Sequence, residues 1–248
     1  MLSWVESGNG KEALRSRGLF ESAQAEMRRG EKRTAIQLFK ASIETSTGGD
    51  FLYCRRAYYF LGQLTGNNYY YEDGARKGDL ECAYKYAIYL SSEEALPRRV
   101  VRWLKLAVAQ PHPLRGEAFY ALGVIYLQNN KEVDGIKYIE TAVLESCEAA
   151  SDFLLQTSCL VPEIFETNSC PFYEKAVAFY YEGEAEKAIK NFGKIVPKSP
   201  LIYYTIGLIY LSLENKHSTG ISYICKAATT QYPHENAIAF LQKLKSFF

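Results

Sequence analysis

The sequence lacks long apolar runs and any strong excess of one charge. No uninterrupted apolar stretch approaches the ~18 to 20 residues that span a bilayer, and residues 1–11 lack the basic and then apolar pattern of a secretion signal. Twenty-nine Lys and Arg residues are balanced by 28 Asp and Glu residues, so no global field favours nucleic acid or an anionic membrane. We therefore expect a cytoplasmic or nuclear chain that neither inserts into membranes nor binds nucleic acid.

Paired cysteines and glycosylation signals are also missing. The six cysteines occur singly, with no C-x-x-C pair and no histidine at motif spacing, and no N-x-[ST] acceptor occurs. This pattern favours neither a zinc site nor a disulfide framework. We expect most of these cysteines to be small buried hydrophobic residues, and we expect no cofactor.

Histidine is scarce, and no catalytic constellation is visible. His112 lies between two prolines, and His217 and His234 fall in predicted breaks, so we expect loop residues rather than bases or ligands. A Gly-Asn-Gly-Lys fragment at residues 8–11 lacks the full spacing of a phosphate-binding loop. The sequence therefore predicts no enzyme activity and identifies no small-molecule substrate.

An internal repeat is the strongest positive signal. Its clearest copy runs from Gly116 to Ala149, where two segments with helical spacing flank a polar break, and the same order returns about 84 residues later. The matching positions are Phe119, Leu122, Gly123, Tyr126, Gly135, Ile139 and Ala142 in one copy and Tyr203, Ile206, Gly207, Tyr210, Gly220, Ile224 and Ala227 in the other. Each copy predicts two antiparallel helices joined by a short turn.

Small residues recur at fixed places in both copies. A glycine inside a helix costs about 1 kcal/mol relative to alanine. Its return at the same position, as Gly123 and Gly207, therefore indicates that packing offsets the cost. We expect these glycines, together with Ala142 and Ala227, to be points where two helices approach closely.

The order of large residues, a small residue and Tyr, followed by Ala, an aromatic residue and Ala, resembles the tetratricopeptide repeat (TPR). Residues 71–90 (YEDGARKGDLECAYKYAIYL) also resemble the related Sel-one-like repeat. More degenerate copies begin near Leu19, Tyr58 and Ala176. The resemblance implies an all-α, right-handed superhelical α-solenoid of about six to seven stacked antiparallel helix pairs. Gly74 and Gly78 predict a short or irregular second helix in the copy that begins at Tyr58.

One region interrupts the period. Pro162 and the run ETNSCP at residues 166–171 contain too many breakers for a complete helix. We expect an N-terminal repeat block at residues 1–158, an irregular connection at residues 159–171, and a C-terminal block at residues 172–248, within one continuous solenoid domain. The last segment, His234–Phe248, is amphipathic at helical spacing and predicts a capping helix.

Twenty tyrosines are many for this length, and several share one register. The same place in six successive first helices holds Phe20, Tyr59, Tyr84, Tyr120, Tyr173 and Tyr204. In the family that the repeat resembles, this place faces a concave groove. One interpretation is packing between neighbouring repeats, because aromatic residues at helical spacing are usually core. The other is a row of rings that holds a peptide or helix of a partner.

The resemblance implies a non-enzymatic protein-interaction scaffold or adaptor. Two alternatives stay open: a helical repeat protein that binds single-stranded RNA, and a Sel-one-like hydrolase. The basic residues Arg28, Arg29, Lys32 and Arg33, together with Arg55, Arg56, Arg98, Arg99 and Arg102, predict a positive face that suits an acidic partner tail, against the default of a solvated surface. The clamp that some tetratricopeptide proteins use for a C-terminal carboxylate is not reproduced here.

Overall fold

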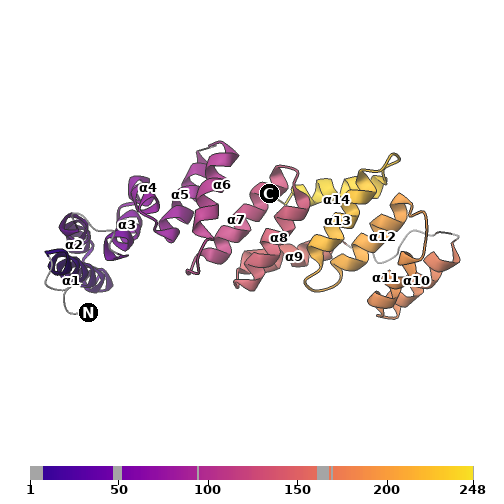
Figure 1. Ribbon diagram of the computed structural model, residues 1–248, viewed down its shortest axis with the longest axis horizontal. Helices are drawn as coiled ribbons and strands as arrows, with labels where there is room; N and C mark the ends of the chain where they lie inside the picture. The colour runs from indigo at the N-terminus through magenta and orange to yellow at the C-terminus, as the bar shows by residue number, and fades with distance from the viewer. Residues whose placement is uncertain (1–7, 47–51, 94, 161–167, 169, 248) are drawn as a thin grey trace. The chain divides into compact units, whose positions relative to one another are not determined.

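The computed structural model describes residues 8–46, 52–93, 95–160, 168 and 170–247, and every regular element in these ranges is an α-helix (Figure 1). The all-α fold predicted from the repeat is confirmed. The chain forms two compact units, residues 1–118 and 119–248.

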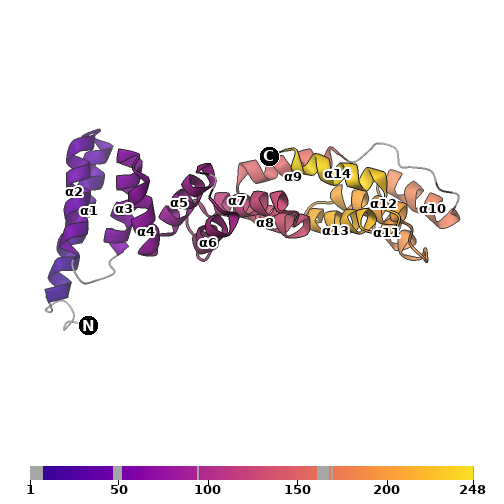
Figure 2. The same cartoon turned by 90° about the horizontal axis from the view of Figure 1, so that it is seen from above.

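The first unit consists of helix hairpins that pack in chain order. Its helices are α1 (Gly8–Arg28), α2 (Lys32–Thr45), α3 (Leu52–Thr65), α4 (Asn68–Arg76), α5 (Leu80–Ser92) and α6 (Pro97–Ala107). Each helix packs on the one that follows it, as Figure 2 allows the reader to trace. Helix α4 has 9 residues, which agrees with the short second helix predicted from its glycines.

Local chemistry explains where these helices begin. The side chain of Asn67 accepts a hydrogen bond from the backbone N–H of Tyr69 at 3.0 Å, and Asp79 accepts one from Cys82 at 2.7 Å. Both are N-caps, which satisfy backbone donors that a helix cannot pair internally. Helix α6 begins at Pro97, whose missing N–H costs nothing at a first helical position.

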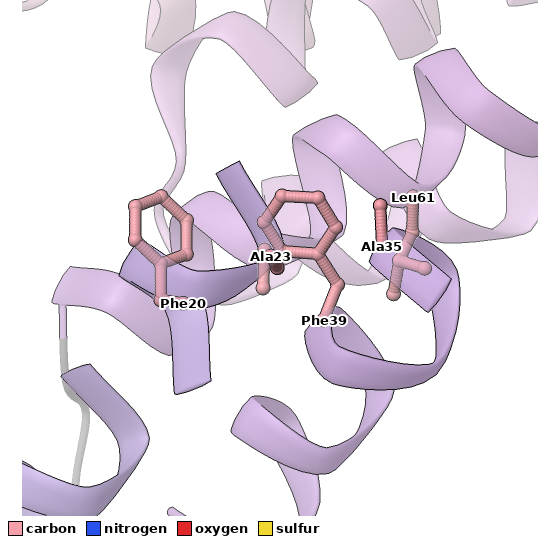
Figure 3. Close-up of a cluster of buried hydrophobic side chains, with 6 residues drawn as sticks. Phe20, Ala23, Ala35, Phe39 and Leu61 are labelled. Carbon is pink, nitrogen blue, oxygen red and sulfur yellow. The ribbon is translucent and has the colours of Figure 1, made fainter. Parts of the chain in front are cut away.

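A buried aromatic cluster joins the first three helices (Figure 3). Phe39 of α2 lies at its centre, with its ring 5.6 Å from that of Phe20 and stacked 5.3 Å from that of Phe60. The alanines Ala23 and Ala35 are fully buried, so α1 and α2 can approach closely. Burial of a phenylalanine stabilises the fold by about 1.5 to 3 kcal/mol relative to exposure, so this cluster fixes the N-terminal hairpin against α3.

The second unit contains the remaining helices. They are α7 (Arg115–Gln128), whose first turn belongs to the first unit, α8 (Glu132–Leu144), α9 (Glu148–Ser158), α10 (Pro171–Tyr181), α11 (Ala185–Gly193), α12 (Pro200–Leu211), α13 (His217–Ala228) and α14 (Glu235–Lys245). Among the described residues of the whole chain, six helix pairs form, and α9 and α14 stand outside them.

Glycines bring the helices of two pairs into close contact, as predicted. A Cβ atom on Gly207 of α12 would lie 2.6 Å from Cγ1 of Ile224 and 2.9 Å from the carbonyl oxygen of Gly220, both in α13. A Cβ on Gly123 would lie 2.8 Å from the carbonyl oxygen of Gly135. Such distances are shorter than any ordinary contact, so only glycine fits at either place.

Packing in the second unit departs from chain order. Helix α13 packs on α8, although α9, α10, α11 and α12 separate them in sequence (Figure 1). A carboxylate oxygen of Glu140 in α8 accepts a hydrogen bond from the backbone N–H of Ser218 in α13 at 2.9 Å. The pair α12–α13 therefore stacks next to α8, while the pair α10–α11 packs on α12.

The C-terminal helix α14 packs on α13, which itself packs on α8, and it also reaches other helices of its unit. Its predicted role as a cap on the open end of the stack stays a prediction. The ammonium group of Lys245 lies 2.7 Å from a carboxylate oxygen of Glu132 and donates a hydrogen bond to Asn130 at 2.6 Å. The ring of Phe247 lies 6.0 Å from that of Phe153 in α9. Helix α14 thus connects α8 and α13, and Phe247, two residues after its end, contacts α9.

The irregular connection predicted at residues 159–171 lies mostly outside the described residues. The division of the chain into blocks at that place stays a prediction. The division that the packing shows falls inside α7, after Ala118.

Candidate functional site

The aromatic row predicted from the repeat register lies largely inside the fold. The exposed fractions are 5% for Phe20, 7% for Tyr59, 1% for Tyr173 and 8% for Tyr204. Tyr84 and Tyr120 are partly exposed. The burial of four rings agrees with the packing interpretation. Binding of a partner by the row stays a prediction.

Each buried ring has a specific neighbour. Tyr173 packs edge-on against Phe192 at 5.3 Å, and its hydroxyl lies 3.1 Å from that of Thr205. Tyr204 stacks on the ring of His234 at 4.8 Å. The contact of Tyr173 with Phe192 lies within the pair α10–α11, its contact with Thr205 reaches the next pair, and Tyr204 meets the N-cap of α14, so these rings serve packing both within a pair and toward neighbouring elements.

Tyr59 belongs to a buried charged cluster between α3 and α5. The guanidinium of Arg56 lies 4.5 Å from the Tyr59 ring centroid, and its Nη2 lies 2.6 Å from a carboxylate oxygen of Glu81. Its Nη1 lies 3.6 Å from a carboxylate oxygen of Asp79, the N-cap of α5. Burial, reinforced by Glu81, raises the pKa of Tyr59 to about 12. Arg56 is thereby committed to internal pairing and does not contribute to the predicted positive face.

The exposed residues of that face lie in two places: around the turn between α1 and α2, where Arg29 pairs with Glu26, and on α6. Arg98, Arg102 and Lys105 are exposed and follow one another at spacings of four and three residues, which places them on one side of the helix. We call these three residues the α6 basic row. The opposite side of α6 holds Val100 and Leu104, which are buried in the core.

A pocket opens beside this row. It has a volume of about 350 Å³ and is lined by Ala75 and Arg76 of α4 and by Arg102, Trp103 and Leu106 of α6. We call it the α4–α6 pocket. Its lining combines three apolar side chains with two guanidinium groups. Volumes of roughly 300 to 1,000 Å³ are typical of small-molecule sites, so this pocket accommodates a group the size of a side chain rather than a large cofactor.

Trp103, the aromatic residue of the pocket lining, is held in place by neighbouring side chains. The ring of Trp103 meets that of Tyr86 edge-on at 5.5 Å, and the Tyr86 hydroxyl accepts a hydrogen bond from Arg99 at 3.1 Å. Burial and the nearby Glu72 carboxylate raise the pKa of Tyr86 above its ordinary value. The guanidinium of Arg102 lies 5.8 Å from the Trp103 ring centroid, within the range of a cation–π contact.

The second arginine of the pocket is exposed but anchored. Arg76 Nη2 lies 2.6 Å from a carboxylate oxygen of Glu72, one turn earlier in α4, and the Arg76 side chain is 65% exposed. A guanidinium has five N–H donors, and one carboxylate contact leaves most of them available. Among the described residues, Arg102 and Lys105 form no ion pair.

Arginine is distributed very unevenly along the chain. All 12 arginines lie between Arg15 and Arg115, so none belongs to the second unit. The first unit has 18 Lys and Arg against 14 Asp and Glu, a formal charge of +4, and the second has 11 against 14, a formal charge of −3. The balanced total charge therefore conceals a basic first unit.

One serine–histidine contact lies in the second unit. His217 was predicted to be a loop residue, but it begins α13 and is 8% exposed. Its Nε2 lies 3.0 Å from the hydroxyl of Ser158, while its Nδ1 is buried and has no hydrogen-bond partner among the described residues. A nucleophilic triad requires a carboxylate on that nitrogen. Burial lowers the pKa of His217, against the opposing effect of Glu140. The arrangement is a structural contact between α9 and α13.

The described residues contain no group of three or more His, Cys, Asp or Glu side chains placed to hold a metal ion. Within the same part of the chain, no helix is long and apolar enough to cross a bilayer.

Sequence reasoning predicted Arg98, Arg99 and Arg102 but missed Arg76 and Trp103. The signal that could have found Trp103 is the segment PRRVVRWLK at residues 97–105, in which four cations surround a tryptophan without any acid. The contribution of Arg76 depends on the packing of α4 beside α6, which the sequence pattern does not specify.

No protein-family model and no curated protein matches the sequence. Among solved structures, the chain is similar to PilF of Pseudomonas aeruginosa over 96% of this chain and 100% of that one, with 14% sequence identity and a TM-score of 0.42. It is similar to MamA over 91% of this chain and 97% of that one, with 18% identity and a TM-score of 0.25. Similarities of this strength support no statement about function, and membership of the tetratricopeptide family stays a prediction from the repeat.

Proposed function

We propose that the chain is a non-enzymatic protein-interaction scaffold, and that its first unit binds an acidic segment of a partner protein along the α6 basic row. The observation that supports this proposal is the exposed row Arg98, Arg102 and Lys105 beside the α4–α6 pocket. The row extends over about 10 Å at 1.5 Å per residue. A segment with several carboxylates over a similar length matches it in charge.

The strength of such binding depends on several contacts acting together. One exposed ion pair contributes only about 0.2 to 1 kcal/mol, and salt screens it. Arginine binds carboxylates better than lysine does, because its planar fork can donate two parallel hydrogen bonds. The row and the adjoining pocket together carry three arginines, Arg76, Arg98 and Arg102, and therefore favour an acidic partner and reject a basic one.

Single-stranded RNA is the second candidate, because arginine beside an aromatic ring also suits unpaired bases. Stacking requires an open ring face. Trp103 is partly buried, with Tyr86 against it and Arg102 over it, so it offers less surface than a stacking platform needs. The observations therefore favour a protein partner.

The proposal is tested by recovering the natural partner from cells with the tagged full chain, with and without nuclease. The test variant reverses the row as Arg98→Glu, Arg102→Glu and Lys105→Glu. We expect the wild-type chain to retain its partner after nuclease treatment and the variant to bind it at least about tenfold more weakly.

The matched control reverses three exposed cations elsewhere in the first unit, as Lys32→Glu, Arg33→Glu and Lys40→Glu. It changes the total charge by the same amount and should keep the partner. Equal loss in both variants would indicate a general charge effect, and loss of the partner on nuclease treatment would favour RNA; either result contradicts the proposal.

A further inference from the structure

Recognition by the first unit depends on shape as well as charge, and this inference rests on the proposed function. We propose that the acidic partner segment carries one large apolar side chain, and that this side chain enters the α4–α6 pocket while neighbouring carboxylates pair with the guanidinium groups at its rim.

The lining of the pocket divides into two chemical parts. Ala75 is almost fully buried, and with Leu106 and the Trp103 ring it forms an apolar surface. Arg76 and Arg102, both exposed, supply the charges. A ligand that carries only charge leaves the apolar surface in contact with water, and one that carries only apolar groups offers no carboxylate to the two guanidinium groups. The segment that satisfies both parts has an apolar residue with acidic neighbours.

The pocket is suited to an anchor because its walls are already ordered. Trp103 is held by Tyr86, which in turn accepts a hydrogen bond from Arg99, and Arg76 is held by Glu72. Groups fixed before binding lose little conformational entropy when a ligand arrives. Tryptophan and arginine are also the residues most often found where a few contacts supply most of the binding energy.

An anionic membrane surface is the competing ligand for a basic helix. The apolar side of α6 faces the core through Val100, Leu104 and Ala107, so it cannot enter a bilayer without unfolding the unit. Attraction to lipid would then be purely electrostatic and would not depend on the pocket. This difference makes the two ligands separable by experiment.

The experiment uses the full chain with Trp4→Phe, which leaves Trp103 as the sole tryptophan because the sequence has 2. The first probe is a short peptide with one Phe between Asp and Glu residues. The second is the same peptide with Ser in place of Phe, so that both carry equal charge. Affinity is measured from the fluorescence of Trp103. We expect the Phe peptide to bind at least about tenfold more tightly than the Ser peptide, with a shift of Trp103 emission.

Two variants of α6 test whether the pocket causes the preference for the Phe peptide. Leu106→Gln removes an apolar side chain from the pocket and should abolish the difference between the peptides. Lys105→Gln is the matched control, since it lies next to the pocket without lining it. It should weaken both peptides equally and keep the difference. If Leu106→Gln fails to fold, the chain with Trp4→Phe alone still tests the inference, because the Phe and Ser peptides can be compared on it without a pocket variant.

The results that would refute the apolar anchor differ from those that would refute the proposed scaffold function. If both peptides bind equally while reversal of the basic row still releases the partner, the anchor is refuted and the scaffold proposal stands. If phosphatidylserine vesicles bind more tightly than the Phe peptide and displace it, the inference is overturned in favour of a membrane surface.

Discussion

The replacement Gly207→Ala tests the close contact between α12 and α13. The added Cβ would lie 2.6 Å from Cγ1 of Ile224, 2.9 Å from the carbonyl oxygen of Gly220 and 3.1 Å from the backbone nitrogen of Ile224. Two of these three atoms belong to the backbone, so rotation of a side chain cannot relieve the clash. The two helices must move apart, and α13 also packs on α8.

Two opposing terms set the magnitude. Overpacking costs about 1 to 3 kcal/mol, while alanine inside a helix is favoured over glycine by about 1 kcal/mol. Because two backbone atoms take part in the clash, we expect an overpacking cost of about 2 to 3 kcal/mol, so that Gly207→Ala lowers the free energy of unfolding by about 1 to 2 kcal/mol. A loss of 1 kcal/mol corresponds to a fall of about 2 to 4 °C in Tm for a protein of this size.

The assay is urea unfolding followed by far-ultraviolet circular dichroism. Gly193→Ala in α11 and Gly18→Ala in α1 are the controls, because a Cβ at either glycine meets nothing within 4 Å. The control at Gly18 lies within its helix and should gain up to about 1 kcal/mol. A Gly207→Ala protein that is as stable as the wild type would refute the argument from close approach.

Two further predictions concern the second unit. Burial lowers the pKa of His217, so its neutral form is favoured in the fold. The resulting stability is fully present above the unfolded pKa of about 6.5 and is lost as pH falls from that value through the lower folded pKa, and His217→Gln should flatten this dependence in urea titrations between about pH 7.5 and 5.5. If the variant and the wild type lose stability equally, His217 does not control this range. Lys245→Met removes the contacts of α14 with Glu132 and Asn130, and we expect a loss of about 0.5 to 1 kcal/mol with faster hydrogen exchange in α14 but not in α12; unchanged exchange in α14 would contradict this role.

The repeat was predictable from sequence because its main determinants are local. Helical spacing, the breaks between helices and the return of Gly123 as Gly207 specify the hairpins and their contact points. Gly135 and Gly220, in the second helix of each pair, were visible as part of the same pattern. Their contact with Gly123 and Gly207 in the first helix is seen only in the folded structure.

The order of packing in the second unit was not predictable in the same way. A repeat pattern implies that each pair stacks on the next, and nothing in it indicates that α13 replaces α10 beside α8. Contacts such as the one between Glu140 and Ser218 join residues 78 positions apart. Such pairs leave no periodic trace in the sequence.

The candidate site shows the same limit. The register of the aromatic row was visible in the sequence. The burial of each ring was not, because it depends on the neighbouring helices; Tyr173, for example, contacts α11 and α12. Likewise, Arg76 and Trp103 meet only because α4 lies near α6 in the folded unit. Sequence reasoning recognised the cations of α6, since they are neighbours along one helix.

The placement of α13 on α8 affects how this protein could change in length. In an array whose repeats contact only their sequence neighbours, a terminal repeat can be lost or duplicated with little effect on the others, and stability is nearly a sum of repeats and interfaces. Here, deletion of everything after α9 would remove the contact of α8 with α13, and duplication of α10 and α11 would insert new chain between two helices that must still meet. Closing that larger loop also slows folding, because distant contacts form late. The second unit is therefore expected to fold, and to be inherited, as a whole.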